Sequence, residues 1–394
     1  MSWCREMYNN WNTVPFTEAV EICDSLRRPI NSSERAARIN GKKKSELYPY
    51  YGATGQVGFI DDYITDGEYV LLGEDGAPFL DAYAPKAYII NGKTWVNNHA
   101  HVLRSKTNNK FLCYYLNSFN YKGFVSGTTR LKLTQAEMKR IPVPVPPIPE
   151  QKRIVARIEE LFSQLDAGVE TLRKTRAQLA VYRQAVLKEA FAGFTDYTTL
   201  ASISTRIFDG PFGTNLKTAD YVSSGIRVVR LENIKNGWFD DSKQSFVTEA
   251  KYESIRQHTV YPSDLIMSTF MSDSIKICQL PAHIPFAVNK ADCIGIRLRD
   301  DYLTKFVMYY LLQKEVYQRV AVDIHGATRP RINTKQIKAI PIPKADFELQ
   351  KAVVSSVEEK LSLCDSIEST VALSLQQTEA MRQSILKQAF EGAL

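Results

Sequence analysis

Apolar residues recur at alternating steps of four and three in two long stretches of the chain, residues 150–191 and 348–390. This heptad spacing predicts a helix whose apolar seam packs against another helix. No proline interrupts either stretch, so each predicts one continuous helix of about 40 residues, or about 60 Å at roughly 1.5 Å per residue. The two stretches together predict a pair of long helices.

The predicted seam is regular in the first helix and less regular in the second. In the first helix it consists of Ile154, Ile158, Leu161, Leu165, Gly168, Leu172, Thr175, Leu179, Tyr182 and Val186. In the second helix it consists of Val353, Val357, Cys364, Ile367, Val371, Met381 and Ile385. Lys360 takes the place of Leu161 there, with Leu361 beside it.

The second helix belongs to a copy of the region that contains the first. The string Gly127-Thr128-Thr129-Arg130 returns as Gly326-Ala327-Thr328-Arg329, and Ile141-Pro142-Val143-Pro144 returns as Ile340-Pro341-Ile342-Pro343. The offset is constant at 199 residues, and 19 of the 54 positions from Ile141 onward are identical in the two copies. Average composition gives far fewer identities by chance, so the region is an internal duplication.

Each copy therefore consists of a globular segment and a helical segment: residues 1–140 and 141–195, then 196–339 and 340–394. Parallel helices would require the second globular segment to carry its ends along the full helix length, whereas antiparallel helices bring those ends together. The expected fold class is α+β, with two mixed α/β domains at opposite ends of an antiparallel two-helix coiled coil and a pseudo-two-fold repeat.

Inside the globular segments, short apolar runs between Gly, Asn and Asp residues predict strands at 69–72, 87–90 and 226–229. Two stretches rich in Leu and aromatic residues, 110–119 and 302–320, predict helices. The segments are thus mixed α/β.

Composition narrows the class of protein. The chain has no apolar run of 18 residues, which predicts a cytoplasmic protein outside the membrane. Its six cysteines form no CxxC pair, so neither a disulfide framework nor a zinc cluster is expected. Residues 1–140 carry 18 basic and 14 acidic groups and residues 196–339 carry 19 and 15, so each globular segment has a net charge of +4. This excess suits a phosphate-binding face without requiring one.

Several motifs have both a structural and a DNA-binding interpretation. The glycine-rich string 49–58 lacks the P-loop pattern and predicts a turn between strands, which could bring Thr54 and Gln56 to a base edge. The basic clusters Arg27-Arg28 and Lys42-Lys43-Lys44 are either solvated surface or phosphate contacts. The repeated strings that end at Arg130 and Arg329 are either turns or phosphate-positioning loops.

His99 and His101 are two residues apart, so both could lie on one side of a strand and bind a metal ion. However, no Cys, Asp or Glu lies at ligand spacing around them. A strand edge with outward polar groups is the better interpretation. Asn97 and Asn98 could read adenine, and Val288-Asn289-Lys290 is a weaker counterpart in the second segment. No catalytic triad, carboxylate pair or nucleotide fingerprint stands out, so we expect no catalytic site.

The duplication has also kept polar residues of the helices, among them Glu159, Arg183 and Gln184. They could be solvated helix positions. Alternatively, their preservation predicts that the outer face of the helices binds something twice.

The chain resembles the specificity subunit of type I restriction-modification systems. The resemblance rests on Ile141-Pro142-Val143-Pro144, on Pro147-Ile148-Pro149-Glu150-Gln151-Lys152, on Leu187-Lys188-Glu189-Ala190-Phe191 and on their second copies. Gly210-Pro211-Phe212-Gly213-Thr214 also looks like a string of that family's target-recognition domains. The second proline string departs from the pattern after Pro343.

The resemblance implies two target-recognition domains that each read half of a split, asymmetric double-stranded DNA site. It also implies helices that bind two methyltransferase subunits, with restriction endonuclease and translocase subunits joining the complex. S-adenosylmethionine would bind the methyltransferase partner, and this chain would hold no cofactor and no metal. The alternatives are a DNA-modifying enzyme with its own active site, or a coiled-coil scaffold for proteins.

The predicted DNA-binding residues are polar or aromatic positions in the two globular segments. They are Arg27, Arg28, Lys42, Lys43, Lys44, Tyr51, Thr54, Gln56, Asn97, Asn98, His99, Thr128, Arg130, Asn215, Lys217, Arg230, Asn233, Lys235, Asn289, Lys290, Thr328, Arg329 and Arg331.

Overall fold

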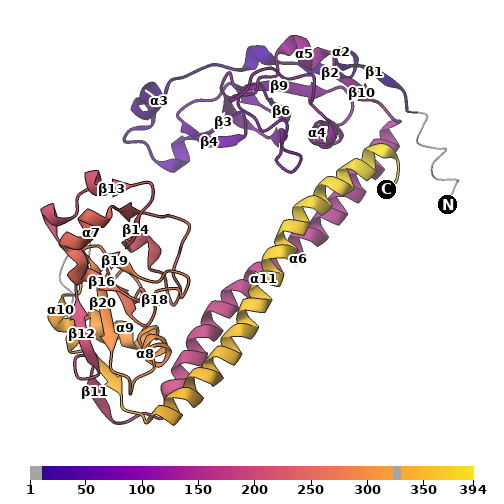
Figure 1. Ribbon diagram of the computed structural model, residues 1–394. Helices are drawn as coiled ribbons and strands as arrows, with labels where there is room; N and C mark the ends of the chain where they lie inside the picture. Colours follow the sequence, from indigo (N-terminus) through magenta and orange to yellow (C-terminus); the bar gives the residue numbers. More distant parts are fainter. Residues whose placement is uncertain (1–10, 323–329) are drawn as a thin grey trace. The chain divides into compact units, whose positions relative to one another are not determined.

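The computed structural model describes residues 11–322 and 330–394. It contains two compact units, Met1–Lys174 with Val371–Leu394, and Thr175–Thr370. We call them unit 1 and unit 2. Each unit consists of one sheet-rich domain and parts of two long helices (Figure 1).

The long helices are α6 (Ile148–Phe191) and α11 (Phe347–Glu391), and each is continuous, as the proline-free stretches predicted. In unit 1, Arg153 of α6 donates to the Leu394 carbonyl, while Asp166 further along α6 pairs with Arg382. From Arg153 to Asp166 the residue number rises along α6, whereas the number of the partner residue falls from Leu394 to Arg382. The predicted antiparallel pairing is confirmed in this unit.

Unit 2 contains the same arrangement. Arg183 of α6 pairs with Asp365 of α11, and Glu189 further along α6 lies 3.5 Å from Lys360. The partner residue number again falls as α6 advances, so the helices are antiparallel here as well.

The seam between the helices is apolar at its ends and partly charged between them. Ile158 and Val357 are buried, as predicted. Gly168, Tyr182, Ile367 and Met381 are exposed, so their assignment to the seam was wrong. The half-buried positions beside the last three are Arg183, Glu368 and Arg382, which form ion pairs between the helices.

The domain of unit 1 is built on two four-stranded sheets. The first has the order β2 (Val20–Ile22), β9 (Ala100–Ser105), β6 (Tyr69–Gly73) and β7 (Ala87–Ile90). The second has the order β4 (Gly55–Ile60), β3 (Tyr48–Gly52), β8 (Lys93–Val96) and β5 (Thr65–Asp66). Helix α4 (Asn109–Ser118) packs its buried residues Leu112 and Leu116 against Leu72 of β6 in the main core of this domain.

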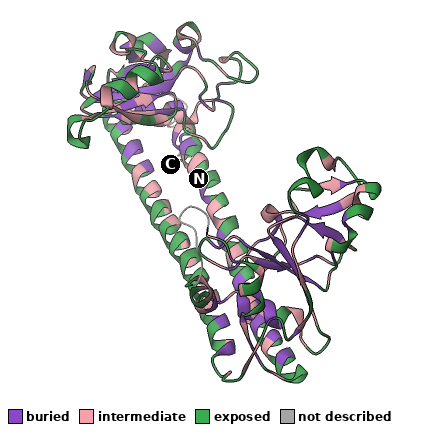
Figure 2. Ribbon diagram, turned by 90° about the vertical axis from the view of Figure 1, so that its left-hand side faces the viewer, coloured by how far each residue is buried: buried purple, intermediate pink, exposed green. Residues whose placement is uncertain are grey.

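The domain of unit 2 has one four-stranded and one five-stranded sheet. The first has the order β12 (Ser204–Phe208), β20 (Cys293–Leu298), β17 (Leu265–Ser268) and β18 (Ile277–Gln279). The second has the order β13 (Tyr221–Val222), β15 (Phe246–Val247), β14 (Ile226–Val229), β19 (Ala287–Asn289) and β16 (Thr259–Val260). Figure 2 shows buried residues concentrated in the sheets of both domains.

The two domains share one topology, apart from the additional strand β13 in the second domain. In the first sheets, β6 pairs antiparallel with β9 and β7, as β17 does with β20 and β18. In the second sheets, β3 runs parallel to β8, as β14 does to β19. The duplication therefore includes the globular segments, whose sequences have diverged.

Most predicted elements within the domains are confirmed. Strands lie at 69–72, 87–90 and 226–229, and α4 accounts for the predicted helix at 110–119. The helix predicted over 302–320 is instead two helices, α8 (Thr304–Leu311) and α9 (Lys314–Ala321). Gln313 between them is buried, and its Nε2 donates to the carbonyl of Tyr310 at the end of α8. This side-chain bond satisfies a terminal carbonyl and ends the helix.

The repeated proline strings are short strands that join each long helix to a domain. β10 (Pro142–Pro144) pairs with β1 (Thr13–Pro15), and β21 (Pro341–Pro343) pairs with β11 (Tyr197–Thr199). Two-stranded ribbons tolerate proline because one edge of each strand needs no donor. None of the described helices is long and apolar enough to cross a membrane.

Candidate nucleic-acid interface

A hollow of about 610 Å³ opens in the first domain where four loops meet. The lining residues come from the β3–β4 turn, the loop after β6, the β8–β9 turn and the loop before residue 132. They are Gly52, Ala53, Thr54, Val57, Asp75, Gly76, Ala77, Pro78, Asn97, His99, Thr129, Arg130 and Leu131. We call this the first hollow.

Asn97 presents a hydrogen-bond donor to the first hollow. The residue is 8% exposed, and its Oδ1 accepts from the His99 amide at 2.8 Å. This bond fixes the orientation of the amide group, and among the described residues no acceptor bonds its Nδ2. A Cβ at Gly52 would lie 3.3 Å from that Nδ2, so glycine leaves space beside the free donor.

Asp75 presents a carboxylate to the same hollow. Its Oδ1 lies 2.7 Å from Nε of Arg130, and its Oδ2 lies 3.6 Å from Nδ1 of His99. The Asp75 side chain remains 26% exposed. The hollow therefore offers both a donor and an acceptor to a ligand.

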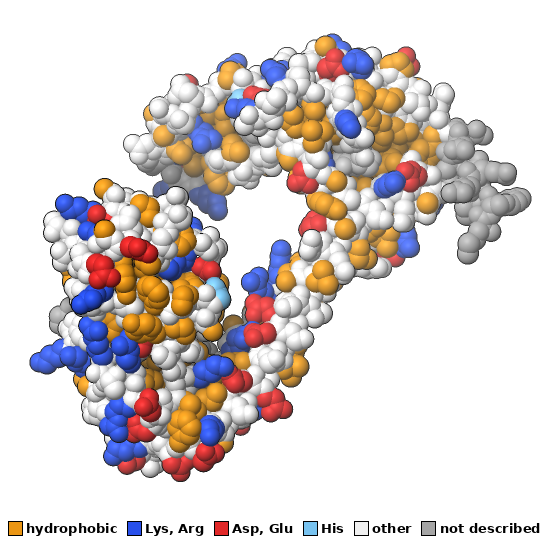
Figure 3. Space-filling view, in the orientation of Figure 1, with side chains coloured by type: hydrophobic (Ala, Val, Ile, Leu, Met, Phe, Trp, Pro, Cys, Tyr) orange, Lys and Arg blue, Asp and Glu red, His pale blue; other side chains and the backbone are white. Residues whose placement is uncertain are grey.

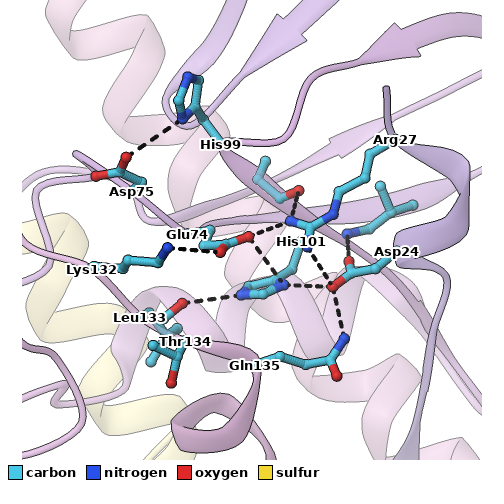
Figure 4. A network of polar contacts seen from close by, with 12 residues as sticks. Asp24, Arg27, Glu74, Asp75, His99, His101, Lys132, Leu133, Thr134 and Gln135 are labelled. Atoms are coloured by element: carbon cyan, nitrogen blue, oxygen red, sulfur yellow. Dashed lines mark hydrogen bonds and ion pairs between the residues drawn. The ribbon is translucent and has the colours of Figure 1, made fainter. Parts of the chain in front are cut away.

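A buried polar network lies behind the loop that carries Asp75 (Figure 4). His101 is fully buried, with Nδ1 2.8 Å from Asp24 Oδ2 and Nε2 3.1 Å from the Leu133 carbonyl. Glu74, which precedes Asp75, forms ion pairs with Arg27 and Lys132. The network thus joins the start of the loop after β6 to the end of the loop before residue 132.

Asp24 is ionised within this network. Burial raises its pKa, but hydrogen bonds from His101, from the Val102 amide and from Gln135 outweigh burial and keep the pKa below its usual value. The charge of Asp24 is therefore a structural element of the first domain.

The second domain has a hollow of about 370 Å³. Its lining residues are Leu231, Ser268, Phe270, Met271, Ser272, Lys276 and Pro330. We call it the second hollow. The guanidinium of Arg331 lies over the Phe270 ring at 4.3 Å.

A family model for the type I restriction modification DNA specificity domain matches residues 9–178. The type I restriction enzyme EcoBI specificity subunit of Escherichia coli is 24% identical over 388 residues, which cover 91% of this chain and 79% of that protein. Residues 9–178 of the chain therefore match the type I restriction modification DNA specificity domain. A Haemophilus influenzae protein provisionally named a type I restriction enzyme specificity subunit is 38% identical over 149 residues, 37% of this chain and 36% of that protein.

Two solved structures share the fold of this chain. One chain from a study of complex assembly of a type I R-M system matches with a TM-score of 0.68 and 16% identity over 98% of each chain. The HsdS subunit from Thermoanaerobacter tengcongensis matches with a TM-score of 0.52 and 16% identity, over 98% of this chain and 97% of that one. The predicted fold class is confirmed.

The first hollow brings together four of the predicted DNA-binding residues: Thr54, Asn97, His99 and Arg130. Thr54 lies in the turn between β3 and β4, which confirms the turn predicted for 49–58. Tyr51 and Gln56 lie on the same two strands, and Gln56 is exposed.

The string 127–130 forms a closed loop at the rim of the first hollow. Gly127 has φ +98°, and Ser126 and Lys132 exchange backbone hydrogen bonds of 3.0 and 2.8 Å. The turn interpretation is correct, and the loop also exposes Thr128 and Arg130. In the second copy, Thr328 and Arg329 lie outside the described residues.

Other predicted residues of the first domain lie away from the hollow. Lys42, Lys43 and Lys44 are exposed beside the short 3-10 helix η2 (Lys44–Glu46), with Lys42 Nζ 2.8 Å from Asp61. The predicted residues Arg28 and Asn98 are also exposed. Arg27 differs, because it is bound internally to Glu74, Asp24 and the Ala100 carbonyl. We therefore assign Arg27 to the network and not to the surface.

The predicted residues of the second domain fall into two groups. In the first group, Arg230 and Lys290 both lie over the Tyr221 ring. Lys235 of this group pairs with Asp240, and the other members, Asn215, Lys217 and Arg331, are exposed.

The second group, Asn233 and Asn289, is buried. Asn233 Nδ2 donates to the Asp240 and Lys243 carbonyls, and Asn289 Nδ2 donates to the Cys293 carbonyl. Because these side chains face the interior, the base contact predicted for them is not retained.

His101 corrects another prediction. The segment 95–102 is not one strand edge with outward polar groups, since β8 ends at Val96 and β9 begins at Ala100. His101 faces the interior, and its carboxylate partner Asp24 lies 77 residues away in sequence. Local alternation could not reveal this partner.

The polar residues repeated in the two helices form ion pairs and hydrogen bonds with other residues of the chain. Glu159 pairs with Lys110 of α4, and its copy Glu358 pairs with Lys305 of α8. Gln184 accepts from the Lys314 amide. These contacts give the preserved residues partners within the chain, and binding of an external partner to the outer face of the helices stays a prediction.

Sequence reasoning missed Asp75, Lys132, Phe270 and Lys276, which line or border the hollows. Lys132 carried a usable signal, because it lies 199 residues before Arg331 inside the repeated string. Asp75 and Phe270 carried no such signal, because they are 195 residues apart and not 199, and their side chains are unlike. Charge does not mark the interface either, since acidic side chains lie among Lys and Arg on the face shown in Figure 3.

Proposed function

We propose that this chain supplies DNA sequence specificity to a type I restriction-modification complex in the cytoplasm by reading a bipartite, asymmetric double-stranded site. The observation that carries the proposal is the presence of two domains of one topology whose loop hollows have different linings. Identical readers would recognise a palindrome, as a symmetric dimer does. Two domains that share a topology but have different loop hollows suit two different half-sites.

The chain acts as a non-catalytic subunit in this proposal. The relatives are named specificity subunits of restriction enzymes. Two methyltransferase subunits would bind the paired helices, restriction and translocase subunits would join them, and S-adenosylmethionine would bind the methyltransferase. The exposed apolar residues Val181 and Leu363 on the helices are available for such docking within unit 2.

A domain exchange tests the proposal. Residues 1–140 are replaced by the corresponding segment of a related specificity subunit, and sites methylated by the assembled complex are sequenced. We expect one half-site to change while the other half-site and the unspecified spacer stay the same. A change in both halves, or a continuous site, would contradict the two-reader arrangement.

A second measurement addresses the enzyme alternative. The purified chain alone is incubated with labelled S-adenosylmethionine and DNA, and the same reaction is repeated with the methyltransferase subunits. We expect label transfer only in the second reaction. Transfer by the chain alone would show an active site of its own.

A further inference from the structure

The loops that form the two hollows are equivalent residue by residue. Gly76 donates its amide to the Leu131 carbonyl at 2.9 Å, and Met271 donates to the Pro330 carbonyl at 3.1 Å. One residue earlier, Asp75 forms a backbone bridge with Lys132, and Phe270 forms one with Arg331. Asp75 and Phe270 therefore occupy the same backbone position in the two domains.

Neighbouring hydrogen bonds support this register. The Leu133 amide donates to the Glu74 carbonyl at 2.8 Å, and the Ile332 amide donates to the Thr269 carbonyl at 2.9 Å. The Asn97 amide donates to Tyr51 and the Lys290 amide donates to Val229, which makes Asn97 and Lys290 equivalent as well.

The hollows themselves are then equivalent sites with different chemistry. Each is lined by the residue at the shared position and by the residue after it, Asp75 and Gly76 or Phe270 and Met271. The first hollow has a carboxylate with the free Asn97 amide donor close by. The described lining of the second has an aromatic ring at that position.

Positive side chains border both hollows. Arg130 and Lys132 are 61% and 50% exposed beside the first hollow. Arg331 is 54% exposed beside the second, and Lys276 lines it. Such side chains bind phosphates and hold a duplex in register, although Arg and Lys also read guanine. Because both hollows have such side chains, we expect the difference between half-sites to come from the uncharged or acidic groups between them.

A carboxylate and a phenyl ring select different base edges. Phosphate repels a carboxylate, so Asp75 in a DNA-facing hollow is suited to accept from the exocyclic amine of cytosine or adenine. A phenyl ring offers no hydrogen bond and suits the methyl group of thymine.

We infer that the position shared by Asp75 and Phe270 determines specificity in each domain: Asp75 accepts from a base amine in one half-site, and Phe270 packs on a thymine methyl in the other. The inference rests on the proposed function and deepens it. It names one base contact in each half-site.

The test compares Asp75→Ala and Phe270→Ala in complexes assembled from the full chain and its methyltransferase partners. A library with randomised target bases is methylated, and the methylated sites are sequenced. Asp75→Ala removes the acceptor and should reduce the preference for adenine or cytosine at one position of one half-site by roughly 10- to 100-fold. Phe270→Ala should do the same for thymine at one position of the other half-site. In each variant the untouched half-site reports that the complex has folded and assembled.

Matched controls change similar side chains elsewhere. Asp81→Ala removes an exposed carboxylate of the loop after β6 that does not line the hollow. Tyr261→Ala removes an aromatic ring that, like Phe270, has an arginine over it, here Arg297 at 4.9 Å. Both controls should leave the motif unchanged.

A substrate change isolates the methyl contact. Replacing the selected thymine by deoxyuridine removes only its methyl group, so methylation by the wild-type complex should fall while Phe270→Ala complexes are unaffected. If both variants keep the wild-type motif, or if either alters both half-sites, the inference is wrong although the proposed function stands. If the wild-type complex selects no motif, the proposed function itself fails.

Discussion

Arg183 of α6 donates to Asp365 of α11 at 2.6 Å, and the same guanidinium lies 3.1 Å from Glu368. The duplication repeats this pair with the roles of the helices exchanged, because Arg382 of α11 pairs with Asp166 of α6. Each copy of the repeat thus supplies the arginine of one pair and the aspartate of the other.

A double-mutant cycle on Arg183→Ala and Asp365→Ala measures the free energy that this ion pair contributes to folding. Asp365 is 68% exposed, so solvent screens the interaction, and we expect a coupling free energy of roughly 0.2–1 kcal/mol. Chemical denaturation of the four proteins provides the values. Coupling above about 2 kcal/mol would show that the seam depends on charge more than on its apolar ends.

Ile158→Asp should destabilise the helix pair strongly. Ile158 is fully buried against Leu386 and Ala389, and an unpaired carboxylate there costs about 3–5 kcal/mol. Leu172→Asp should cost less, because Leu172 is half-buried. Gln164→Asp on the exposed face is the control, and thermal unfolding ranks the three variants. Equal melting temperatures would contradict the assigned seam.

Asp24→Asn should destabilise the first domain in a pH-dependent way. The folded-state pKa of Asp24 lies below its unfolded value near 3.9, so the stabilisation is complete above about pH 4 and is lost as pH falls through the folded pKa. At pH 6 we expect a loss of about 2 kcal/mol. Hydrogen exchange of β9 amides between pH 3 and 7 measures it. A difference between variant and wild type that grows as pH falls would contradict this sign.

Gly210→Ala should disrupt the second domain. A Cβ at Gly210 would lie 2.1 Å from the carbonyl carbon of Lys290, which is backbone and cannot rotate away. We expect a loss of about 3 kcal/mol, measured by urea denaturation. Gly168→Ala is the counterpart, since no atom of the described chain lies within 4 Å of its Cβ and alanine favours helix by about 1 kcal/mol. Similar effects of the two variants would refute the steric explanation.

Arg130→Ala should weaken DNA binding by the assembled complex for all sequences, and most for sites with the base that Asp75 selects, because Arg130 Nε also lies 2.7 Å from Asp75 Oδ1. Arg130 is 61% exposed at the rim of the first hollow, where it can neutralise one phosphate. The slope of log affinity against log salt should fall in magnitude by about 1. Binding is measured by fluorescence anisotropy at several salt concentrations. An unchanged slope with an altered motif would instead make Arg130 a base reader.

Local pattern and repetition determined much of this protein from sequence alone. The heptad steps and missing prolines were enough for α6 and α11, because helix formation depends on neighbours three and four residues apart. The turn between β3 and β4 followed from its glycines. The constant offset of 199 residues identified the duplication, and the connection between copies implied antiparallel helices.

Tertiary structure decided what depends on distant partners. His101 can be buried because Asp24 and the Leu133 carbonyl, from other parts of the chain, form hydrogen bonds with its ring. Arg183 lies half-buried in the seam because it forms an ion pair with Asp365 of the other helix. The equivalence of Asp75 and Phe270 appears only in backbone hydrogen bonds. Loops of different length lie between the repeated strings and the strands, so sequence spacing is lost while strand pairing, which requires every buried backbone group to be satisfied, preserves the register.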